Sequence, residues 1–124
     1  MKEIMAIIRP KKVGPTKDAL EKLGFPSITA VSVLGRGRQR GIAGEVGCDL
    51  RPDLSVPAKS GGGMKYVPKR LLCLVVRDDD VDRVVQTIIE VNQTSRIGDG
   101  KIFTCPLDNA VRVRTDEDGD KAIT

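Results

Sequence analysis

One apolar pattern occurs twice in this chain, at two places 68 positions apart. The paired residues, first copy and then second copy, are Ile7 and Val75, Ile8 and Val76, Arg9 and Arg77, Val13 and Val81, Leu20 and Ile88, and Leu23 and Val91. In each copy an apolar strand precedes residues with the spacing of an amphipathic helix, and another strand follows. Two β-α-β halves in one chain are typical of a ferredoxin-like sheet. The sequence therefore predicts an α+β fold, a ferredoxin-like double β-α-β arrangement.

The elements can be placed from the apolar runs and from the residues that end them. The predicted strands are Lys2–Arg9, Ser27–Leu34, Arg70–Arg77 and Lys101–Cys105, with a short final strand at Val111–Arg114. The first predicted helix opens at Pro15 and Thr16 and ends at Gly24, because glycine readily adopts the left-handed conformation of a helix end. The second helix follows Asp78–Asp80, whose carboxylates are expected to cap it and to interact favourably with its positive end.

Both helices are expected on one face of the sheet, which leaves a second, partly apolar face. The residues predicted on that second face are Met5, Ile7, Val31 and Leu74. An exposed apolar sheet face favours association with another copy of the chain. The pattern therefore predicts a homo-oligomer.

Composition restricts the functions that such a domain could have. The 124-residue chain has no histidine, the commonest general base, so a small enzyme that uses lysine, aspartate or cysteine is a less favoured alternative. Aromatic residues make up 2% of the chain, and the strands Lys2–Arg9 and Arg70–Arg77 contain none. RNA-binding domains of this fold stack bases on aromatic residues in those strands, so no nucleic-acid partner is expected. Without a long apolar segment or a signal-peptide pattern, the chain is expected to be cytoplasmic, with no membrane insertion.

The segment 36–69 interrupts the regular pattern. It contains seven glycines and three prolines. Its seven basic and three acidic residues account for the whole net charge of +4. A loop of this length within a small domain is normally either functional or disordered.

The three cysteines have no metal-ligand spacing. Cys73 and Cys105 lie in apolar runs, so we expect them to be small buried apolar residues. Cys48 lies in the polar loop and is expected to be a free thiol.

The run Ile97–Phe103 has the residue types of an anion-binding turn. Its two glycines let backbone N–H groups approach a ligand, and Lys101 adds a positive charge. The run differs from a P-loop because Ile102 follows the lysine, where a P-loop has serine or threonine. A plain turn before a strand is the alternative interpretation.

Other basic residues could complete such a site. They are Arg36, Arg38 and Arg40 at the start of the long loop, Lys69 and Arg70 at its end, and Arg112 and Arg114, which alternate along the predicted last strand. Together with Lys101 they carry enough positive charge for a triphosphate and a dicarboxylate. The preferred hypothesis is a ligand-sensing signal protein, in which a rigid body holds a nucleotide and the long loop contacts a target.

The chain resembles the PII signal-transduction family over nearly its whole length. The resemblance is carried by Lys2–Pro10, Gly35–Gly41, Val67–Lys69, Ile97–Phe103 and Val111–Thr115. It implies one PII-like domain over residues 1–124, in which 36–69 is the long, flexible regulatory loop (the T-loop). It also implies a homotrimer that is not an enzyme, with ATP or ADP in the clefts between subunits and 2-oxoglutarate beside ATP and Mg²⁺.

The resemblance assigns the ligand-binding residues by position. The nucleotide-binding residues are Ile7, Thr29, Arg38, Val75, Thr94, Gly98, Asp99, Gly100, Lys101, Arg112 and Arg114, of which Arg112 and Arg114 reach in from the neighbouring subunit. The 2-oxoglutarate-binding residues are Gln39, Gly41 and Lys69. Gln39 would also coordinate Mg²⁺, together with the ATP phosphates and 2-oxoglutarate.

Departures from the general family pattern point to one subgroup. The loop is longer than in the general members, and the tyrosine that many of them carry for modification has no counterpart. Ser95 stands where the family has glycine, and Cys73 and Leu71 replace charged residues near the adenine position. The chain therefore resembles the longer-loop paralogue of the nif-associated PII proteins, which act in pairs.

The subgroup implies a target. Its members bind the dinitrogenase component of nitrogenase and inhibit it when ammonium is plentiful, and 2-oxoglutarate with ATP relieves the inhibition. The trimer could also mix with a PII paralogue. The alternative is a general PII protein that regulates an ammonium channel or glutamine synthetase, for which an arginine in the loop, such as Arg51, would be the distinguishing feature.

Overall fold

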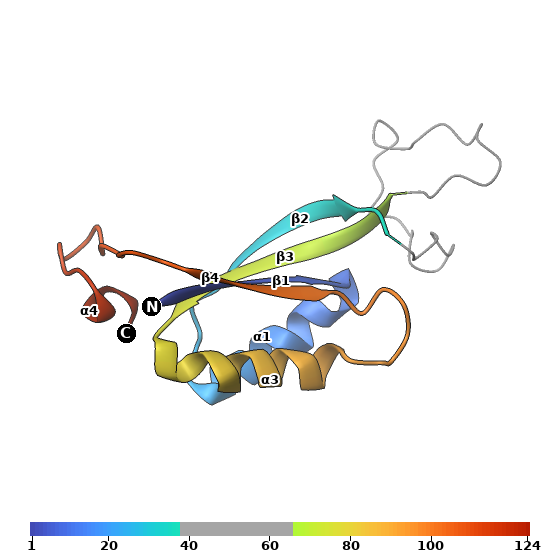
Figure 1. Cartoon of the computed structure of the whole chain (residues 1–124), viewed down its shortest axis with the longest axis horizontal. Coiled ribbons are helices and arrows are strands. Elements are labelled where there is room, and N and C mark those ends of the chain that lie inside the picture. Colours follow the sequence, from blue (N-terminus) through green and yellow to red (C-terminus); the bar gives the residue numbers. More distant parts are fainter. Residues whose placement is uncertain (38–65) are drawn as a thin grey trace.

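The computed structural model describes residues 1–37 and 66–124, which form an antiparallel sheet covered on one face by two helices (Figure 1). The elements in chain order are β1 (Lys2–Ile8), η1 (Pro10–Lys12), α1 (Val13–Leu23), β2 (Thr29–Gly35), β3 (Val67–Val76), η3 (Asp78–Asp80), α3 (Val81–Asn92), β4 (Lys101–Pro106) and α4 (Asp120–Ile123). The strand order is β2-β3-β1-β4, and each neighbouring pair is antiparallel. The predicted ferredoxin-like double β-α-β fold is confirmed.

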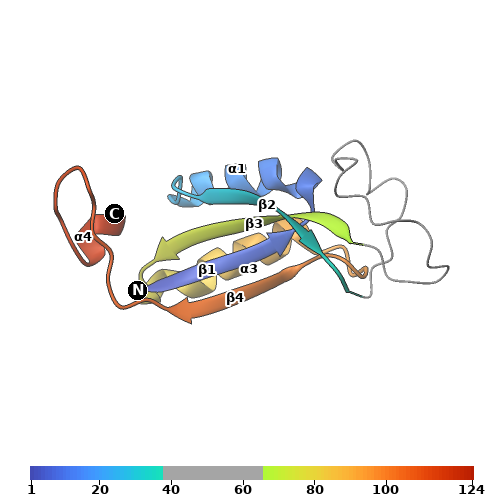
Figure 2. The same cartoon turned by 90° about the horizontal axis from the view of Figure 1, so that it is seen from above.

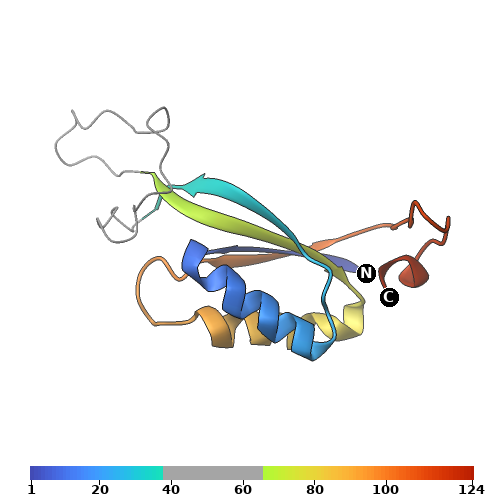
Figure 3. The same ribbon diagram turned by 180° about the vertical axis from the view of Figure 1, so that it is seen from behind.

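The core lies between the sheet and the two helices, which share one side of it in Figures 1 and 3. Strand alternation turns Ile4, Ala6 and Ile8 of β1 toward the helices, where all three are buried. Leu20 of α1 and Ile88 of α3 pack into the same cluster. Because the chain has so few aromatic residues, this core is built from aliphatic side chains.

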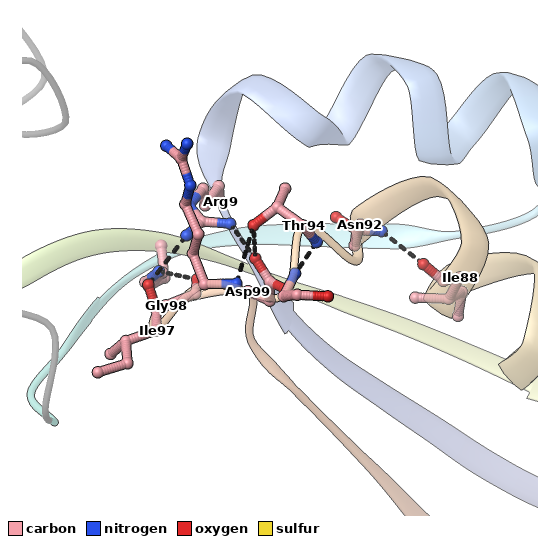
Figure 4. A network of polar contacts seen from close by, with 10 residues as sticks. Arg9, Ile88, Asn92, Thr94, Ile97, Gly98 and Asp99 are labelled. Atoms are coloured by element: carbon pink, nitrogen blue, oxygen red, sulfur yellow. Dashed lines mark hydrogen bonds and ion pairs between the residues drawn. The ribbon is translucent and has the colours of Figure 1, made fainter.

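A buried amide joins the two helices. Asn92, at the end of α3, donates from Nδ2 to Thr16 Oγ1 of α1 at 3.0 Å and to the Ile88 carbonyl at 2.9 Å. Thr16 in turn donates to the Lys12 carbonyl at 2.6 Å. These hydrogen bonds join the end of α3 to the first turn of α1. Figure 4 shows the bond from Asn92 to the Ile88 carbonyl.

The prediction that Leu74 lies on the open face is wrong. Leu74 is in register with Ile4 of β1 and lies in the core beneath the helices. The neighbouring strand residue Cys73, in register with Met5, is on the open face instead. The apolar run in β3 has no polar residue at alternate positions, so its two faces could not be distinguished from the sequence.

The two described cysteines are half-buried, whereas the sequence predicted buried ones. Both lie on the open face, where Cys73 pairs with Met5 and Cys105 pairs with Glu3. Burial raises the pKa of the Cys73 thiol, and the charge of Glu3 adds to this effect. Cys48 lies outside the described residues.

Strand β3 begins at Val67, three residues before the predicted start. Pro68 and Lys69 pair with Leu34 and Val33 of β2. At this end β3 extends past β1, whose pairing stops at Ile8. Pro68 therefore has only one neighbouring strand, which is where a sheet tolerates proline.

The acidic run before α3 does not cap the helix as predicted. Asp78–Asp80 form η3, and no side-chain hydrogen bond caps either η3 or α3. The Asp80 carboxylate instead binds Arg83 at 2.7 Å. The end of the first helix is as predicted, because Gly24 has a φ of 102° and its N–H donates to the Glu21 carbonyl.

The predicted final strand over Val111–Arg114 is not formed. Val111 makes a single antiparallel bridge to Asp118, and the residues between them turn. The N–H of Asp116 donates to the Arg112 carbonyl at 2.8 Å, and Asp116 has a φ of 59°. Aspartate and glycine favour such turns, so the alternation of Arg112 and Arg114 along a strand does not occur.

In the two described ranges, no helix combines the length and apolar character that crossing a membrane requires.

Candidate functional site

The loop between α3 and β4 is organised around the carboxylate of Asp99 (Figure 4). It accepts hydrogen bonds from the Thr94 N–H at 2.7 Å, the Ser95 N–H at 2.9 Å and the Thr94 hydroxyl. A fourth donor is Arg9 Nη1, at 2.6 Å. The carboxylate therefore ties both ends of the loop together and joins them to the end of β1.

Burial alone would raise the pKa of Asp99, but the hydrogen bonds from Thr94, Arg9 and Ser95 outweigh it and hold this pKa well below its usual range. The carboxylate is thus charged and fully engaged. Among the predicted ligand residues, Asp99 and the Thr94 hydroxyl shape the loop by these bonds. The predicted ligand residues of this loop that line the neighbouring groove are Gly98, Gly100 and Lys101.

Arg9 belongs to this network, although no motif in the sequence assigned it to the site. It is 6% exposed, and its Nη2 also donates to the Ile97 carbonyl at 3.1 Å. A buried guanidinium requires an anionic partner. The position of Arg9, directly after an apolar strand, was a signal of burial, but nothing in the sequence identified Asp99 as its partner ninety positions away.

The two glycines of the loop have backbone conformations that other residues rarely adopt. Gly98 has a φ of 100° and Gly100 a φ of 118°. A Cβ at Gly100 would lie 2.0 Å from the Ile7 carbonyl oxygen, so the loop packs directly on β1. Ser95 also has a left-handed φ of 66°.

A groove of 360 Å³ lies between this loop and the ends of the strands. Its lining residues are Ile7, Gly35, Arg36, Gly37, Val67, Lys69, Ile97, Gly98, Gly100, Lys101 and Phe103. Lys101 is in register with Ile7, and Lys69 Nζ donates to the Gly98 carbonyl at 2.7 Å. The groove thus combines an apolar wall with positive charge and glycine backbone, which suits an anion attached to an apolar or planar group.

The other described nucleotide residues of the prediction, Thr29, Val75, Arg112 and Arg114, do not line this groove. Thr29 begins β2 and pairs with Cys73, level with Met5 near the middle of the sheet. A second cavity, of 740 Å³, is lined by Ser27, Val75 and Arg112 among others. The segment that carries Arg112 and Arg114 ends near α4, far from the glycine loop (Figure 2).

The structure therefore divides the predicted site into two groups. Ile7, Lys69, Gly98, Gly100 and Lys101 form one group, and Val75 and Arg112 line the cavity at the other end of the sheet. Thr29 lies between the two, level with Met5. Arg38, Gln39 and Gly41 lie outside the described residues. Within residues 1–37 and 66–124, no cluster of acidic or cysteine side chains could hold a metal ion.

The fold and its basic, glycine-rich loop define a small ferredoxin-like domain with two cavities at opposite ends of the sheet. The family model described as nitrogen regulatory protein P-II matches residues 1–117. The chain belongs to the P-II family, as its resemblance predicted. By the family and by their names its relatives are regulators, in agreement with the expectation that the chain is not an enzyme.

Three curated relatives illustrate the similarity. The "nitrogen fixation nifHD1 region GlnB-like protein 2" of Methanosarcina barkeri is 53% identical over 123 residues, which is 99% of each chain. The "nitrogen fixation nifHD region GlnB-like protein 2" of Methanobacterium ivanovii is 54% identical over 124 residues, again 99% of each chain. The "nitrogen regulatory protein P-II 2" of Methanothermobacter thermautotrophicus is 48% identical over 124 residues, 99% of this chain and 97% of that one.

A solved structure agrees with the fold. The crystal structure of Arabidopsis thaliana PII bound to citrate has a TM-score of 0.72 and 33% sequence identity, and the match covers 98% of this chain and 88% of that chain. The chain is thus a PII nitrogen regulatory protein of the nifHD-associated GlnB-like type.

Proposed function

We propose that this protein senses ATP or ADP together with 2-oxoglutarate, and that it controls nitrogenase by protein contact through its long loop. The observation that carries the proposal is the preformed glycine loop. Arg9 and Asp99 hold it in one conformation, and its residues Gly98, Gly100 and Lys101 line the groove. Such a preorganised, positively charged turn suits the phosphate groups of a nucleotide.

Each nucleotide would lie between two subunits of a homotrimer. Within one subunit, the cavity that Val75 and Arg112 line lies at the other end of the sheet from the groove beside Lys101, so the two would form one site, as its two half-sites, only between neighbouring copies. One subunit would supply Ile7, Arg38, Thr94, Lys101 and the backbone of Gly98–Gly100. Its neighbour would supply Thr29, Val75, Arg112 and Arg114. The open apolar sheet face supports the oligomer that this arrangement needs.

The second effector would bind next to the phosphates. Lys69 already contacts the Gly98 carbonyl, so its ammonium group lies beside the loop that would hold the nucleotide. We assign the distal carboxylate of 2-oxoglutarate to Lys69 and the rest of the molecule to Gln39 and Gly41. Gln39 would also coordinate Mg²⁺ between the phosphates and 2-oxoglutarate. The dicarboxylate would then bind well only when nucleotide and Mg²⁺ are present.

The regulatory loop would be residues 36–69 of a single domain, 1–124. The relatives from M. barkeri and M. ivanovii carry names that place them in nitrogen-fixation regions, which supports the dinitrogenase component as the target. Mixed trimers with a paralogue would fit the same setting. A general PII role at an ammonium channel or glutamine synthetase is the second candidate, because a similar relative is named only as a nitrogen regulatory protein.

Isothermal titration calorimetry tests the sensing function. ATP with Mg²⁺ and 2-oxoglutarate are titrated separately and then together. We expect 2-oxoglutarate to bind only in the presence of ATP and Mg²⁺. Binding of 2-oxoglutarate alone would refute the coupling, and no binding of ATP or ADP would refute the nucleotide site. Pull-down of dinitrogenase or of glutamine synthetase, with and without the ligands, separates the two candidate targets.

A further inference from the structure

The segment after β4 folds back around the guanidinium group of Arg112. Arg112 Nη1 lies 2.9 Å from Glu117 Oε2. Its Nη2 donates to the Thr124 carbonyl at 2.7 Å and to the Lys121 carbonyl at 3.0 Å. Both terminal nitrogens of this arginine therefore have acceptors from residues 117–124, which we call the strap.

Backbone contacts hold the strap in this position. The Arg112 N–H donates to the Glu117 carbonyl at 2.8 Å, and Val111 bridges to Asp118. Asp120 of the strap lies 3.6 Å from Arg77, which directly follows β3. The strap is thus attached both to its own turn and to the end of the sheet.

The strap also lines the second half-site. Ala122, Ile123 and Thr124 border the same 740 Å³ cavity as Val75 and Arg112. The strap therefore has two effects on the second half-site. It satisfies the charge of Arg112 with a carboxylate, and its last residues border the space in which a nucleotide would meet that arginine.

We propose that Glu117 sets the nucleotide affinity of this protein by competing with phosphate for Arg112. The inference rests on the nucleotide site proposed above. A phosphate group that binds the terminal nitrogens of Arg112 competes with Glu117 for them, and the cost of opening this ion pair lowers the apparent affinity. The strap is then an autoinhibitory contact that nucleotide binding displaces.

The variant Glu117→Gln tests this competition, and Asp116→Asn is its matched control. Both remove one negative charge from the same turn. Asp116 makes no ion pair in the described part of the chain, and asparagine tolerates its left-handed backbone. In Glu117→Gln, the carbonyl oxygens of Lys121 and Thr124 remain as acceptors for Arg112, so the strap keeps its fold.

The measurement is ATP binding in the presence of Mg²⁺ by calorimetry, on the full-length protein. We expect Glu117→Gln to bind ATP about fivefold more tightly than Asp116→Asn. This factor corresponds to the loss of a competing ion pair that stabilises the closed strap by about 1 kcal/mol. In the unmodified protein, hydrogen exchange of a peptide covering 117–124 is expected to accelerate when ATP saturates the site.

Three results would overturn this proposal and leave the nucleotide site intact. Equal affinities of the two variants would show that Glu117 does not compete, and weaker binding by Glu117→Gln would show that it supports Arg112 as a ligand. Unchanged exchange of the strap with bound ATP would show that the strap stays in place. If no variant binds a nucleotide, the nucleotide site itself fails and this inference fails with it, whereas normal binding with equal affinities refutes the inference alone.

Discussion

Replacing Gly100 by alanine should displace the loop that we assign to nucleotide binding. The added Cβ would lie 2.0 Å from the carbonyl oxygen of Ile7, whereas real Cβ atoms keep at least 3.0 Å from such a neighbour. The obstacle is backbone, so a flexible side chain cannot relieve it. The loop or the end of β1 must move by about 1 Å, which disturbs the pairing of Ile7 with Lys101.

The expected cost follows from two contributions. An alanine at a φ of 118° is strained, by about 1–2 kcal/mol. Loss of a hydrogen bond of the β1–β4 ladder and of loop contacts adds roughly 1–2 kcal/mol. We therefore expect Gly100→Ala to lower the free energy of unfolding by about 3 kcal/mol.

Gly24→Ala is the matched control, because it separates strain from steric overlap. Gly24 has a φ of 102°, but a Cβ there would meet nothing within 4 Å. This variant should cost only the strain, about 1–2 kcal/mol, and should bind ATP normally. The assay is urea denaturation at one fixed protein concentration, since association changes apparent stability, combined with ATP titration. If Gly100→Ala is no less stable than Gly24→Ala and binds ATP equally well, the reasoning is refuted.

Two further predictions concern the same loop. Ser95→Gly should raise the free energy of unfolding by about 0.5–1 kcal/mol, because glycine relieves the left-handed backbone at φ 66°; unchanged or lower stability in urea denaturation would contradict this. The lowered pKa of Asp99 implies that its ionised form stabilises the fold above its ordinary pKa of about 4, and that this contribution is lost as the pH falls toward the lowered folded value. The stability advantage of the unmodified protein over Asp99→Asn should therefore shrink between about pH 4 and pH 2. An advantage that stays constant over this range would show that Asp99 does not stabilise through its charge.

The fold was predictable because the two halves repeat one pattern. The helix end at Gly24 and the helix over Val81–Asn92 followed from glycine chemistry and from apolar spacing. The strand faces were harder to predict. In β1 the polar residues Lys2 and Glu3 give little guidance, and in β3 every position from Leu71 to Val76 is apolar, so the register that buries Leu74 is set by pairing with β1.

The candidate site was predictable in its backbone but not in its contacts. Two glycines and a lysine in seven positions indicated a turn that approaches an anion. The network that stiffens this turn joins Arg9 to Asp99 across most of the chain, and such long-range pairing leaves no local signal. The turn after Val111 was missed because alternating valine and arginine resemble a strand, whereas Asp116 and the following residues reverse the chain.

The most direct test of the central claim asks whether one nucleotide site needs residues from two subunits. Lys101→Ala removes the cation beside the glycine loop, and Arg114→Ala removes a cation of the other half-site. We expect each variant alone to bind ATP weakly, and co-expressed mixed trimers to regain tight binding, because an unaltered loop then faces an unaltered Arg114. Mixed trimers that bind ATP no better than the separate variants would contradict a shared site. That result would indicate that each nucleotide site lies within one subunit.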